Sequence, residues 1–244
     1  MIPSMEPRVT EDALLGGRVR LLQPARGYRV AVDAVLLAAA IDARPGQRVL
    51  DLGAGVGAVG ICLAARVPGC SVIGVELQAE LAQLAQRNAA LNGVSARVTT
   101  VLHDLALPLP DVGLFDHVAT NPPYLPAAVA DPSPLRSKAL ATVESSIGLA
   151  GWLAVAAQAA KPAGTLLLIH RRDRLDEIVD LLSELGWGEI RIKHLPPAPR
   201  VLLRAQRSSS RICREAAPLV LHRSEGGFTE AAQAILRNAA PLAF

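Results

Sequence analysis

The residues best suited to chemistry close a short apolar run near the middle of the chain. Asn121-Pro122-Pro123-Tyr124 follows residues 115–120, a run typical of a buried β-strand. An amide, two prolines and an aromatic ring at the end of a strand form a site able to hold one planar nitrogen and the flat group that carries it. These four residues therefore predict a site that modifies an amino group.

The amide and the neighbouring carbonyl indicate how an unreactive amine would be activated. An exocyclic amine on a purine is a poor nucleophile because its lone pair is delocalised into the ring. If its N–H bonds donate to the Asn121 side-chain oxygen and the Pro122 carbonyl, the lone pair turns toward an electrophile, and both acceptors stabilise the charge that develops on nitrogen. The prolines keep the acceptors rigid, and Tyr124 would stack on the base. A proline-rich turn with a surface tyrosine is the alternative.

A glycine-rich loop, DLGAGVG at residues 51–57, lies about seventy residues upstream and follows another apolar run. Gly53, Gly55 and Gly57 let the backbone turn tightly and approach a ligand, and the next helix offers its N-terminus. The spacing is GxGxG and not the GxGxxG of dinucleotide-binding folds. A pyrophosphate ligand is therefore the weaker interpretation.

Three carboxylates stand at the tips of successive predicted strands, where parallel sheets bind ligands. We expect Asp51 to pair with an ammonium group, Glu76 to accept hydrogen bonds from ribose hydroxyls, and His103-Asp104 to accept from an adenine amino group. S-adenosylmethionine carries all three groups. Individually, these acids are also compatible with a helix cap, a surface charge and a turn residue.

Hydrophobic periodicity predicts the elements that must position these residues. Alternating runs at 19–23 and 28–32 predict an N-terminal hairpin, and Asp33 is placed to cap a helix at 34–41. From residue 48 onward apolar strands alternate with helices, which predicts a parallel sheet covered on both faces. The predicted strands lie at 49–52, 71–75, 97–102, 115–120 and 165–170, followed by an antiparallel pair at 188–193 and 200–206. The predicted helices lie at 59–66, 77–91, 140–160, 174–185 and 229–238.

The composition allows one well-buried core. The chain has 244 residues, of which 51% are hydrophobic and only 3% aromatic, so we expect an interior of Ala, Leu, Val and Ile. Basic residues outnumber acidic ones by 7 to 5 in residues 1–48 and by 13 to 9 in residues 151–244, whereas residues 49–150 hold 5 basic and 8 acidic ones. This pattern suits a cationic cofactor in the centre and a polyanion held from the sides. Solvated surface arginines are the alternative.

Cysteine usage and the apolar runs bear on the cellular compartment. Three cysteines without a CxxC pair predict no disulfide framework and a reducing compartment. Residues 1–12 lack the build of a signal peptide, and the longest apolar stretch, 34–41, is too short to span a bilayer. We therefore expect a soluble, cytoplasmic protein with no membrane segment and no metal site.

Together, these residues resemble a known family. VLDLGAG at residues 49–55 and Asn121-Pro122-Pro123-Tyr124 are similar to the motifs of class I S-adenosylmethionine-dependent methyltransferases that act on amino groups. The flanking stretches 23–37 and 219–237 resemble those of the bacterial tRNA(Val) adenine-N6 methyltransferases, so the resemblance covers nearly the whole chain. The chain departs from that family in the Pro- and Ala-rich stretch 125–138 and before the last predicted strand, where Arg200 stands.

The resemblance implies an α/β, Rossmann-like fold with a mostly parallel seven-stranded sheet and helices on both faces. It implies one methyltransferase domain over residues 1–244, with an N-terminal hairpin and helix (1–44), a catalytic core (45–207) and a C-terminal extension (208–244). In this family the substrate is the adenine immediately 3′ of the anticodon of a valine tRNA.

The resemblance also implies roles for individual residues. Asn121, Pro122, Pro123 and Tyr124 would be catalytic. The N-terminal segment would cover the cofactor, with Tyr28 and Asp33 as weaker candidates. S-adenosylmethionine would be held by Asp51, Gly53, Ala54, Gly55, Glu76, Leu77, His103, Asp104 and Asn121.

Contacts to RNA are expected from basic residues on the sheet edge that carries the site. His170-Arg171-Arg172 and the loop with Arg136 and Lys138 are the candidates, and each phosphate contact would add to the salt dependence of binding. Arg172 and Arg174 are equally compatible with solvating the start of a helix that Asp173 caps.

Three other functions are compatible with these residues. Glutamine-amide methyltransferases of release factors carry the same four-residue motif, but a separate helical domain precedes their catalytic fold, whereas here about 45 residues precede the first sheet strand. A non-catalytic protein that binds S-adenosylmethionine or RNA is the second, although this chain keeps the acceptor amide and the loop glycines. A free small-molecule substrate is a further possibility, because the net charge is only +3.

Overall fold

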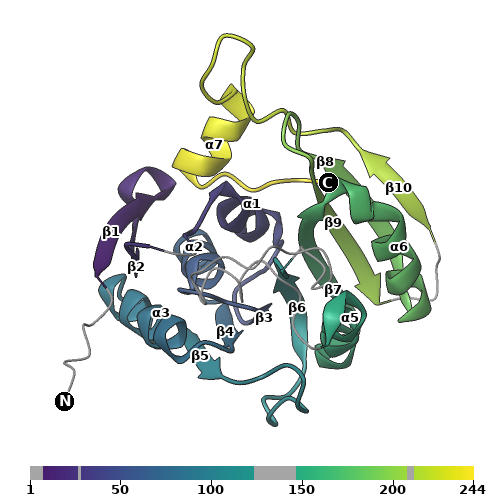
Figure 1. The fold of residues 1–244 in the computed structure, drawn as a ribbon, viewed down its shortest axis with the longest axis horizontal. Coiled ribbons are helices and arrows are strands. Elements are labelled where there is room, and N and C mark those ends of the chain that lie inside the picture. The colour runs from purple at the N-terminus through teal and green to yellow at the C-terminus, as the bar shows by residue number, and fades with distance from the viewer. Residues whose placement is uncertain (1–7, 27–28, 124–146, 208–211) are drawn as a thin grey trace.

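A central sheet with helices on both faces dominates the computed structural model, which describes residues 8–26, 29–123, 147–207 and 212–244 (Figure 1). In these ranges the sheet has eight strands. Their spatial order is β10 (Cys213–Ala216), β8 (Trp187–His194), β9 (Arg200–Arg207), β7 (Ala160–Arg171), β6 (Phe115–Thr120), β3 (Arg48–Leu52), β4 (Ser71–Glu76) and β5 (Val98–Leu102).

Because of the strand directions, the carboxyl ends of β3, β4, β5, β6 and β7 lie at one edge of the sheet. Strands β7, β6, β3, β4 and β5 are parallel, whereas β9 is antiparallel to both β7 and β8 and therefore begins at the edge where β7 ends. The chain runs outward from β3 through β4 to β5 and then returns to β6 on the other side of β3. Leu52 pairs with Thr120 across this reversal, which is the position where open α/β sheets bind ligands.

The helices form two layers with separate apolar clusters. Helices α1 (Val32–Ala40), α2 (Ala58–Arg66), α3 (Ala79–Leu91) and α7 (Glu230–Asn238) share one cluster, and α5 (Gly148–Ala159) and α6 (Leu175–Glu184) share the other. Strand β3 contributes side chains to both clusters, because Val49 belongs to the first cluster and Leu50 to the second. The buried residues are mainly Ala, Leu, Val and Ile, as the composition predicted. The predicted α/β class with a mostly parallel sheet is confirmed.

The N-terminal hairpin differs from the prediction. It consists of β1 (Val9–Leu14) and β2 (Val19–Pro24), which pair antiparallel, and not of residues 19–23 with 28–32. A short 3₁₀ turn, η1 (Leu15–Gly17), connects the strands, and Gly16 and Gly17 adopt φ of 65° and 93°, which glycine does without strain. Among residues 28–32, Tyr28 lies outside the described residues and 29–31 belong to no strand.

Two further expectations are wrong. Asp33 does not cap α1, whose N-cap is Ala31; the carboxylate instead forms an ion pair with Arg200. In the part of the chain that the structure describes, the sheet has eight strands and not seven, because β10 pairs in parallel with β8 at the edge. The β10 sequence, CREA, is mostly exposed and charged, so it carries no apolar signal.

The other predicted elements are present with small changes at their ends. Helix α5 begins at Gly148, and residues 140–146 of the predicted helix lie outside the described residues. Helix α7 begins after Thr229, whose hydroxyl accepts from the Ala232 N–H at 3.2 Å. A second 3₁₀ turn, η2 (Arg172–Arg174), leads from β7 into α6, and Asp173 caps neither element with its side chain.

No helix within the described ranges is long and apolar enough to cross a membrane. The three cysteines are free thiols, of which Cys62 and Cys70 are buried and Cys213 is exposed.

Candidate active site

One pocket at the carboxyl edge of the sheet unites the residues predicted to hold the cofactor. It encloses about 1000 Å³, including the part open to solvent, between the loop after β3 and the ends of β4, β5 and β6. All nine predicted cofactor residues line it: Asp51, Gly53, Ala54, Gly55, Glu76, Leu77, His103, Asp104 and Asn121. Strand tips far apart in the sequence are thus brought to one cavity.

The glycine loop is held against β4 by its backbone. The N–H groups of Gly53 and Ala54 both donate to the Val75 carbonyl, at 2.9 and 3.0 Å. A side chain at Gly74 of β4 would place its Cβ 2.7 Å from the Ala54 Cβ, so only glycine allows this close approach. Gly74 stands in the middle of a predicted strand without a turn signal, so the sequence pattern did not indicate this role.

Glu76 organises the loop more than was expected. One carboxylate oxygen accepts from the Gly55 N–H and the other from the Gln78 N–H, both at 2.8 Å. Burial is the main influence on the pKa of Glu76 and raises it, while these hydrogen bonds oppose the shift. Because each carboxylate oxygen has a second lone pair, the backbone contacts leave capacity for ribose hydroxyls. The predicted contact with ribose therefore stays a prediction.

Asp51 has the opposite environment. It is 2% exposed, and its Oδ2 atom has no hydrogen-bond partner among the described residues. Burial, followed by repulsion from Glu76, raises the pKa of Asp51 to about 7. A buried carboxylate without a partner is unfavourable, and a cationic ligand would relieve it. This orphaned oxygen in the pocket wall fits the ammonium group of S-adenosylmethionine.

The far end of the pocket lies after β5. Asp104 accepts the Ala106 N–H at 2.9 Å through Oδ1, so it is a turn residue and lines the pocket at the same time. The His103 ring nitrogen Nε2 lies 3.4 Å from the Leu107 carbonyl. Asp104 can therefore be a turn residue and still accept a hydrogen bond from an adenine amino group, as predicted.

The predicted acceptor motif is split between the pocket wall and the interior. Asn121 and Pro123 line the pocket, whereas Pro122 is buried and is not part of the pocket wall. Tyr124 lies outside the described residues. Asn121 and Asp51 thus line one cavity, at the ends of the neighbouring strands β6 and β3.

Trp152 of α5 is a pocket residue that the sequence analysis missed. Its indole N–H donates to the Thr120 hydroxyl at 2.7 Å, and that hydroxyl donates to the Leu52 carbonyl at 3.0 Å. A Cβ on Gly53 would come within 3.0 Å of the Trp152 ring. Trp152 therefore joins the ends of β3 and β6 and supports the loop from the α5 side. Its one detectable signal was its type, since the chain has only two tryptophans.

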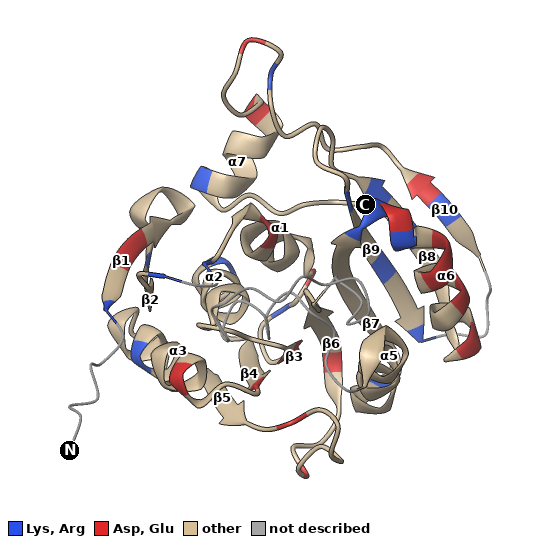
Figure 2. Cartoon of the chain, viewed as in Figure 1, with Lys and Arg blue, Asp and Glu red and all other residues tan. Residues whose placement is uncertain are grey.

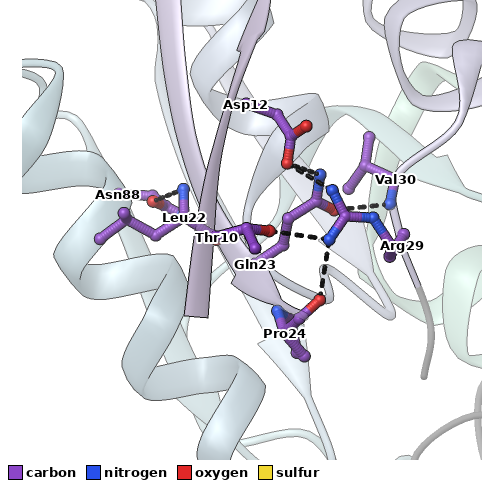
Figure 3. Close-up of polar contacts among 8 residues, drawn as sticks. All are labelled: Thr10, Asp12, Leu22, Gln23, Pro24, Arg29, Val30 and Asn88. Atoms are coloured by element: carbon purple, nitrogen blue, oxygen red, sulfur yellow. Dashed lines mark hydrogen bonds and ion pairs between the residues drawn. The ribbon is translucent and has the colours of Figure 1, made fainter. Parts of the chain in front are cut away.

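The N-terminal segment contributes Val30 to the pocket wall, and its predicted role of covering the cofactor stays a prediction. Val30 lines the pocket, and its N–H donates to the Gln23 side-chain oxygen at 2.9 Å (Figure 3). Gln23 donates in turn to Asp12 at 2.8 Å, and Asp12 forms an ion pair with Arg29 at 2.6 Å. Arg29 also donates to the Thr10 hydroxyl at 2.8 Å. The hairpin thus holds Val30 at the wall of the cavity through side chains.

Asn88 of α3 fastens the same hairpin to the glycine loop. It is fully buried, accepts the Leu22 N–H at 2.7 Å and donates to the Leu22 carbonyl at 2.9 Å (Figure 3). Its amide also donates to the Val56 carbonyl at 2.9 Å. One side chain therefore sets the distance between the hairpin and the loop.

A second cavity adjoins the first, and Asn121 belongs to the walls of both. Asp33, residues 169–173, Pro199 and Arg200 form the rest of its wall, so Asp33 does not line the first pocket. The predicted RNA-binding run His170-Arg171-Arg172 lies here, whereas Arg136 and Lys138 are outside the described residues. Figure 2 shows basic residues on β8 and β9 and acidic residues along α6.

In the described part of the chain, three arginines, two aspartates and one histidine line the second cavity. Arg171 pairs with Asp173 through Nε and Oδ1 at 2.9 Å. Burial, followed by repulsion from Arg174, lowers the pKa of His170 to about 4, so the imidazole is neutral near pH 7.

Within the described ranges, no group of three or more His, Cys, Asp or Glu side chains is placed to hold a metal ion.

Comparisons with known proteins agree with this geometry. The family model of the methyltransferase small domain matches residues 29–173, which is more than half of the chain. The chain is 29% identical over 208 residues to a tRNA1(Val) (adenine(37)-N6)-methyltransferase of Aeromonas hydrophila, covering 83% of this chain and 86% of that protein.

Other relatives carry different names. The chain is 35% identical over 153 residues to the release factor glutamine methyltransferase of Deinococcus radiodurans, covering 59% of this chain and 53% of that protein. Among solved structures, a predicted O-methyltransferase from Agrobacterium tumefaciens superposes with a TM-score of 0.70 at 28% identity, covering 86% of this chain and 98% of that one.

Proposed function

The chain belongs to the methyltransferase small domain family and is an S-adenosylmethionine-dependent methyltransferase, and on this premise we propose that it methylates the N6 amino group of an adenine in tRNA. The proposed target is the adenine immediately 3′ of the anticodon of a valine tRNA. We further propose that residues 1–244 form one methyltransferase domain that works in the cytoplasm.

The position of Asn121 is the observation that carries this proposal. Its side chain lies at the end of β6, in the wall that the cofactor pocket shares with the second cavity. Leu52 and Thr120 are register partners, so Asp51 and Asn121 stand at adjoining strand ends. A cationic methyl donor held at Asp51 and an amino group held at Asn121 would therefore meet.

The chemistry assigned to this chain is orientation and charge stabilisation. Bound S-adenosylmethionine supplies a methyl group on an electrophilic sulfonium. Asn121 accepts one N–H of the adenine amino group through its side-chain oxygen, and the Pro122 carbonyl accepts the other. These two acceptors turn the nitrogen lone pair toward the donor and stabilise the positive charge that develops on nitrogen. No separate base is needed, because the methylated nitrogen is acidic and loses its proton to water.

The substrate assignment draws on the relatives and on charge. The tRNA methyltransferase of Aeromonas hydrophila matches the chain over 86% of its length, whereas the release factor methyltransferase of Deinococcus radiodurans matches over 53% of its length. The basic residues around the second cavity also favour a polyanion over a protein loop. Glutamine methylation of a release factor stays the second candidate, because that relative shares 35% identity.

Methyl transfer from labelled S-adenosylmethionine to three acceptors separates the candidates. Bulk unmodified tRNA, a release factor and a metabolite extract would be incubated with the wild type and with an Asn121→Ala variant. We expect label in tRNA that depends on Asn121 and that digests to N6-methyladenosine. Label in the release factor would replace the proposal with its rival, and label in none of them would favour a non-catalytic protein.

A further inference from the structure

An ion pair in the second cavity has an arrangement typical of anion-binding arginines. Asp33 of α1 contacts Arg200 at the start of β9, with 3.0 Å between Oδ2 and the guanidinium Nε. The Asp33 side chain is only 9% exposed, whereas the Arg200 side chain is 35% exposed and reaches the cavity. The carboxylate therefore fixes the guanidinium from its inner side.

The Arg200 side chain is partly exposed, and its terminal nitrogens point to a possible use of this group. Among the described residues, no hydrogen bond or ion pair reaches the Nη1 and Nη2 atoms of Arg200. Because the guanidinium is planar and held through Nε, its two terminal nitrogens present a fork that matches two oxygens of a phosphate. Arg172, which is exposed and lines the same cavity, adds a second positive charge.

Asp33 itself has an unused acceptor. Its Oδ1 atom is buried and has no hydrogen-bond partner among the described residues, while burial raises the pKa of the carboxyl group and the charge of Arg200 opposes that shift. An anion at this oxygen would be repelled, whereas a neutral hydroxyl would donate to it. In an RNA chain the free ribose hydroxyl is the 2′-OH.

The walls that carry these groups are tied together by the backbone. The Arg172 N–H donates to the Pro199 carbonyl at 2.9 Å. Arg171 of β7 and Arg200 of β9 are opposite each other in the register of the two antiparallel strands. Asn121 borders the cavity from the side of the cofactor pocket. A nucleotide whose amino group lies at Asn121 would therefore extend into a cavity already shaped at its far wall.

We propose that the second cavity binds the ribose-phosphate of the acceptor nucleotide. Arg200 contacts a phosphate with its Nη1 and Nη2 groups, and Asp33 positions Arg200 while its Oδ1 accepts the 2′-hydroxyl. The neutral His170 forms part of the wall and adds no charge. This inference rests on the proposed function, because it assumes that the acceptor is a nucleotide in RNA.

Arg200→Gln and Arg204→Gln form a matched pair for the test. Both residues lie on β9 and lose the same charge, but Arg204 does not line either cavity. Unmodified tRNA would be titrated by fluorescence anisotropy over a salt series, and methylation kinetics and calorimetric binding of S-adenosylhomocysteine would be measured in parallel. For Arg200→Gln we expect a tenfold to hundredfold weaker tRNA affinity (roughly, for a lost charged hydrogen-bond pair) and a salt slope smaller by about 0.7 to 0.9.

Further variants should separate the role of Arg200 from that of Asp33. Arg204→Gln should bind tRNA like the wild type, and neither variant should change cofactor affinity by more than about twofold, the scatter between independent sites. Arg200→Lys should fall between the wild type and Arg200→Gln, because it keeps the charge and loses the fork. A 2′-deoxy substitution at the target adenosine should raise the KM of the wild type and have no effect on Asp33→Ala.

Each outcome decides the inference. If Arg200→Gln unfolds because it leaves Asp33 buried and unpaired, the double variant Asp33→Asn/Arg200→Gln takes its place and should show the same loss of tRNA affinity. If the wild type methylates tRNA and Arg200→Gln behaves like Arg204→Gln, the inference is wrong and the proposed function stands. If the wild type does not methylate tRNA at all, both are wrong.

Discussion

The two cavities at the carboxyl edge of the sheet differ in which groups contact their buried carboxylates. Backbone N–H groups contact Glu76 in the first pocket, and an arginine contacts Asp33 in the second cavity. In the first pocket, Glu76 receives backbone N–H groups on both oxygens, whereas Asp51, at the tip of the neighbouring strand, has an oxygen with no partner among the described residues. In the second cavity, Asp33 contacts Arg200 with one oxygen, and its other oxygen has no hydrogen-bond partner within the described ranges. Satisfied carboxylates hold the protein frame, and unsatisfied ones mark where a ligand would complete the site.

Removing the amide shared by both cavities should have the largest effect. Asn121→Ala should lower kcat by about 100-fold to 1000-fold, because it deletes one preorganised acceptor of the charge that develops on nitrogen. The affinity for S-adenosylhomocysteine should fall much less than kcat, since Asp51 and Glu76 are intact and Asn121 is one of many residues in the pocket wall. Single-turnover methylation and calorimetry measure the two effects. A loss of cofactor affinity with an unchanged turnover rate would place Asn121 in the cofactor site alone.

The next largest effect concerns the orphaned carboxylate of the first pocket. Asp51→Asn should weaken S-adenosylmethionine binding by about 10-fold to 100-fold, because a charged contact is replaced by a neutral one. The control is Glu80→Gln, which removes the same charge from the exposed first turn of α3. Equilibrium dialysis with labelled cofactor is the measurement. Equal affinities for the two variants would refute the role of Asp51.

The raised pKa of Asp51 gives this pocket a pH dependence. Because the pKa is about 7 in the ligand-free protein, the carboxylate is mostly protonated at pH 6 and mostly ionised at pH 8. Cofactor affinity should therefore rise by about tenfold between these values and level off above pH 8. Asp51→Asn should abolish this rise, which calorimetry at several pH values would show.

The same shift predicts an opposite trend in the stability of the free protein. The folded-state pKa of about 7 lies above the ordinary value of 3.8, so the folded state holds an extra proton between these values. The contribution of Asp51 to the free energy of unfolding is fully present below about pH 4 and is lost as pH rises through 7. The total loss is at most about 4 kcal/mol. At pH 8 without cofactor, Asp51→Asn should be more stable than the wild type in urea. A less stable variant would show that Asp51 has a partner in the free protein.

The hairpin contact should have the smallest effect. Gln23→Ala removes the acceptor for the Val30 N–H and should speed cofactor dissociation by about fivefold, as expected for one lost hydrogen bond. Asn92→Ala is the control, because Asn92 bonds the Arg20 backbone of the same hairpin at 2.9 and 2.7 Å, away from the pocket. Stopped-flow dissociation rates compare them. Similar rates for both variants would mean that the hairpin acts through general stability.

Local sequence patterns predicted the part of the site that follows strand tips. Asp51, Glu76 and Asp104 each lie at or near the end of a predicted strand, so they could be placed together from the parallel-sheet rule alone. The roles of Gly74 and Trp152 were missed, because their significance depends on contacts between segments distant in the chain. Periodicity cannot report such contacts.

The hairpin and the second cavity show the same limit. Residues 9–14 carry a weak alternation, and the Gly16-Gly17 turn that pairs them with β2 was not recognised. Asp33 had the type and place of a helix cap, but its partner is Arg200, which β9 brings to the same sheet edge from much later in the chain. The role of this pair required the strand order.

A crystal structure with S-adenosylhomocysteine and an anticodon-loop RNA would show whether Asn121 holds the target amino group. We expect the target adenine N6 atom within about 3 Å of the Asn121 side-chain oxygen and the Pro122 carbonyl, and the ammonium group of the cofactor product at Asp51. We expect the ribose-phosphate of the same nucleotide beside Arg200, as part of the same arrangement. An Asn121 amide that faces away from both ligands would contradict it.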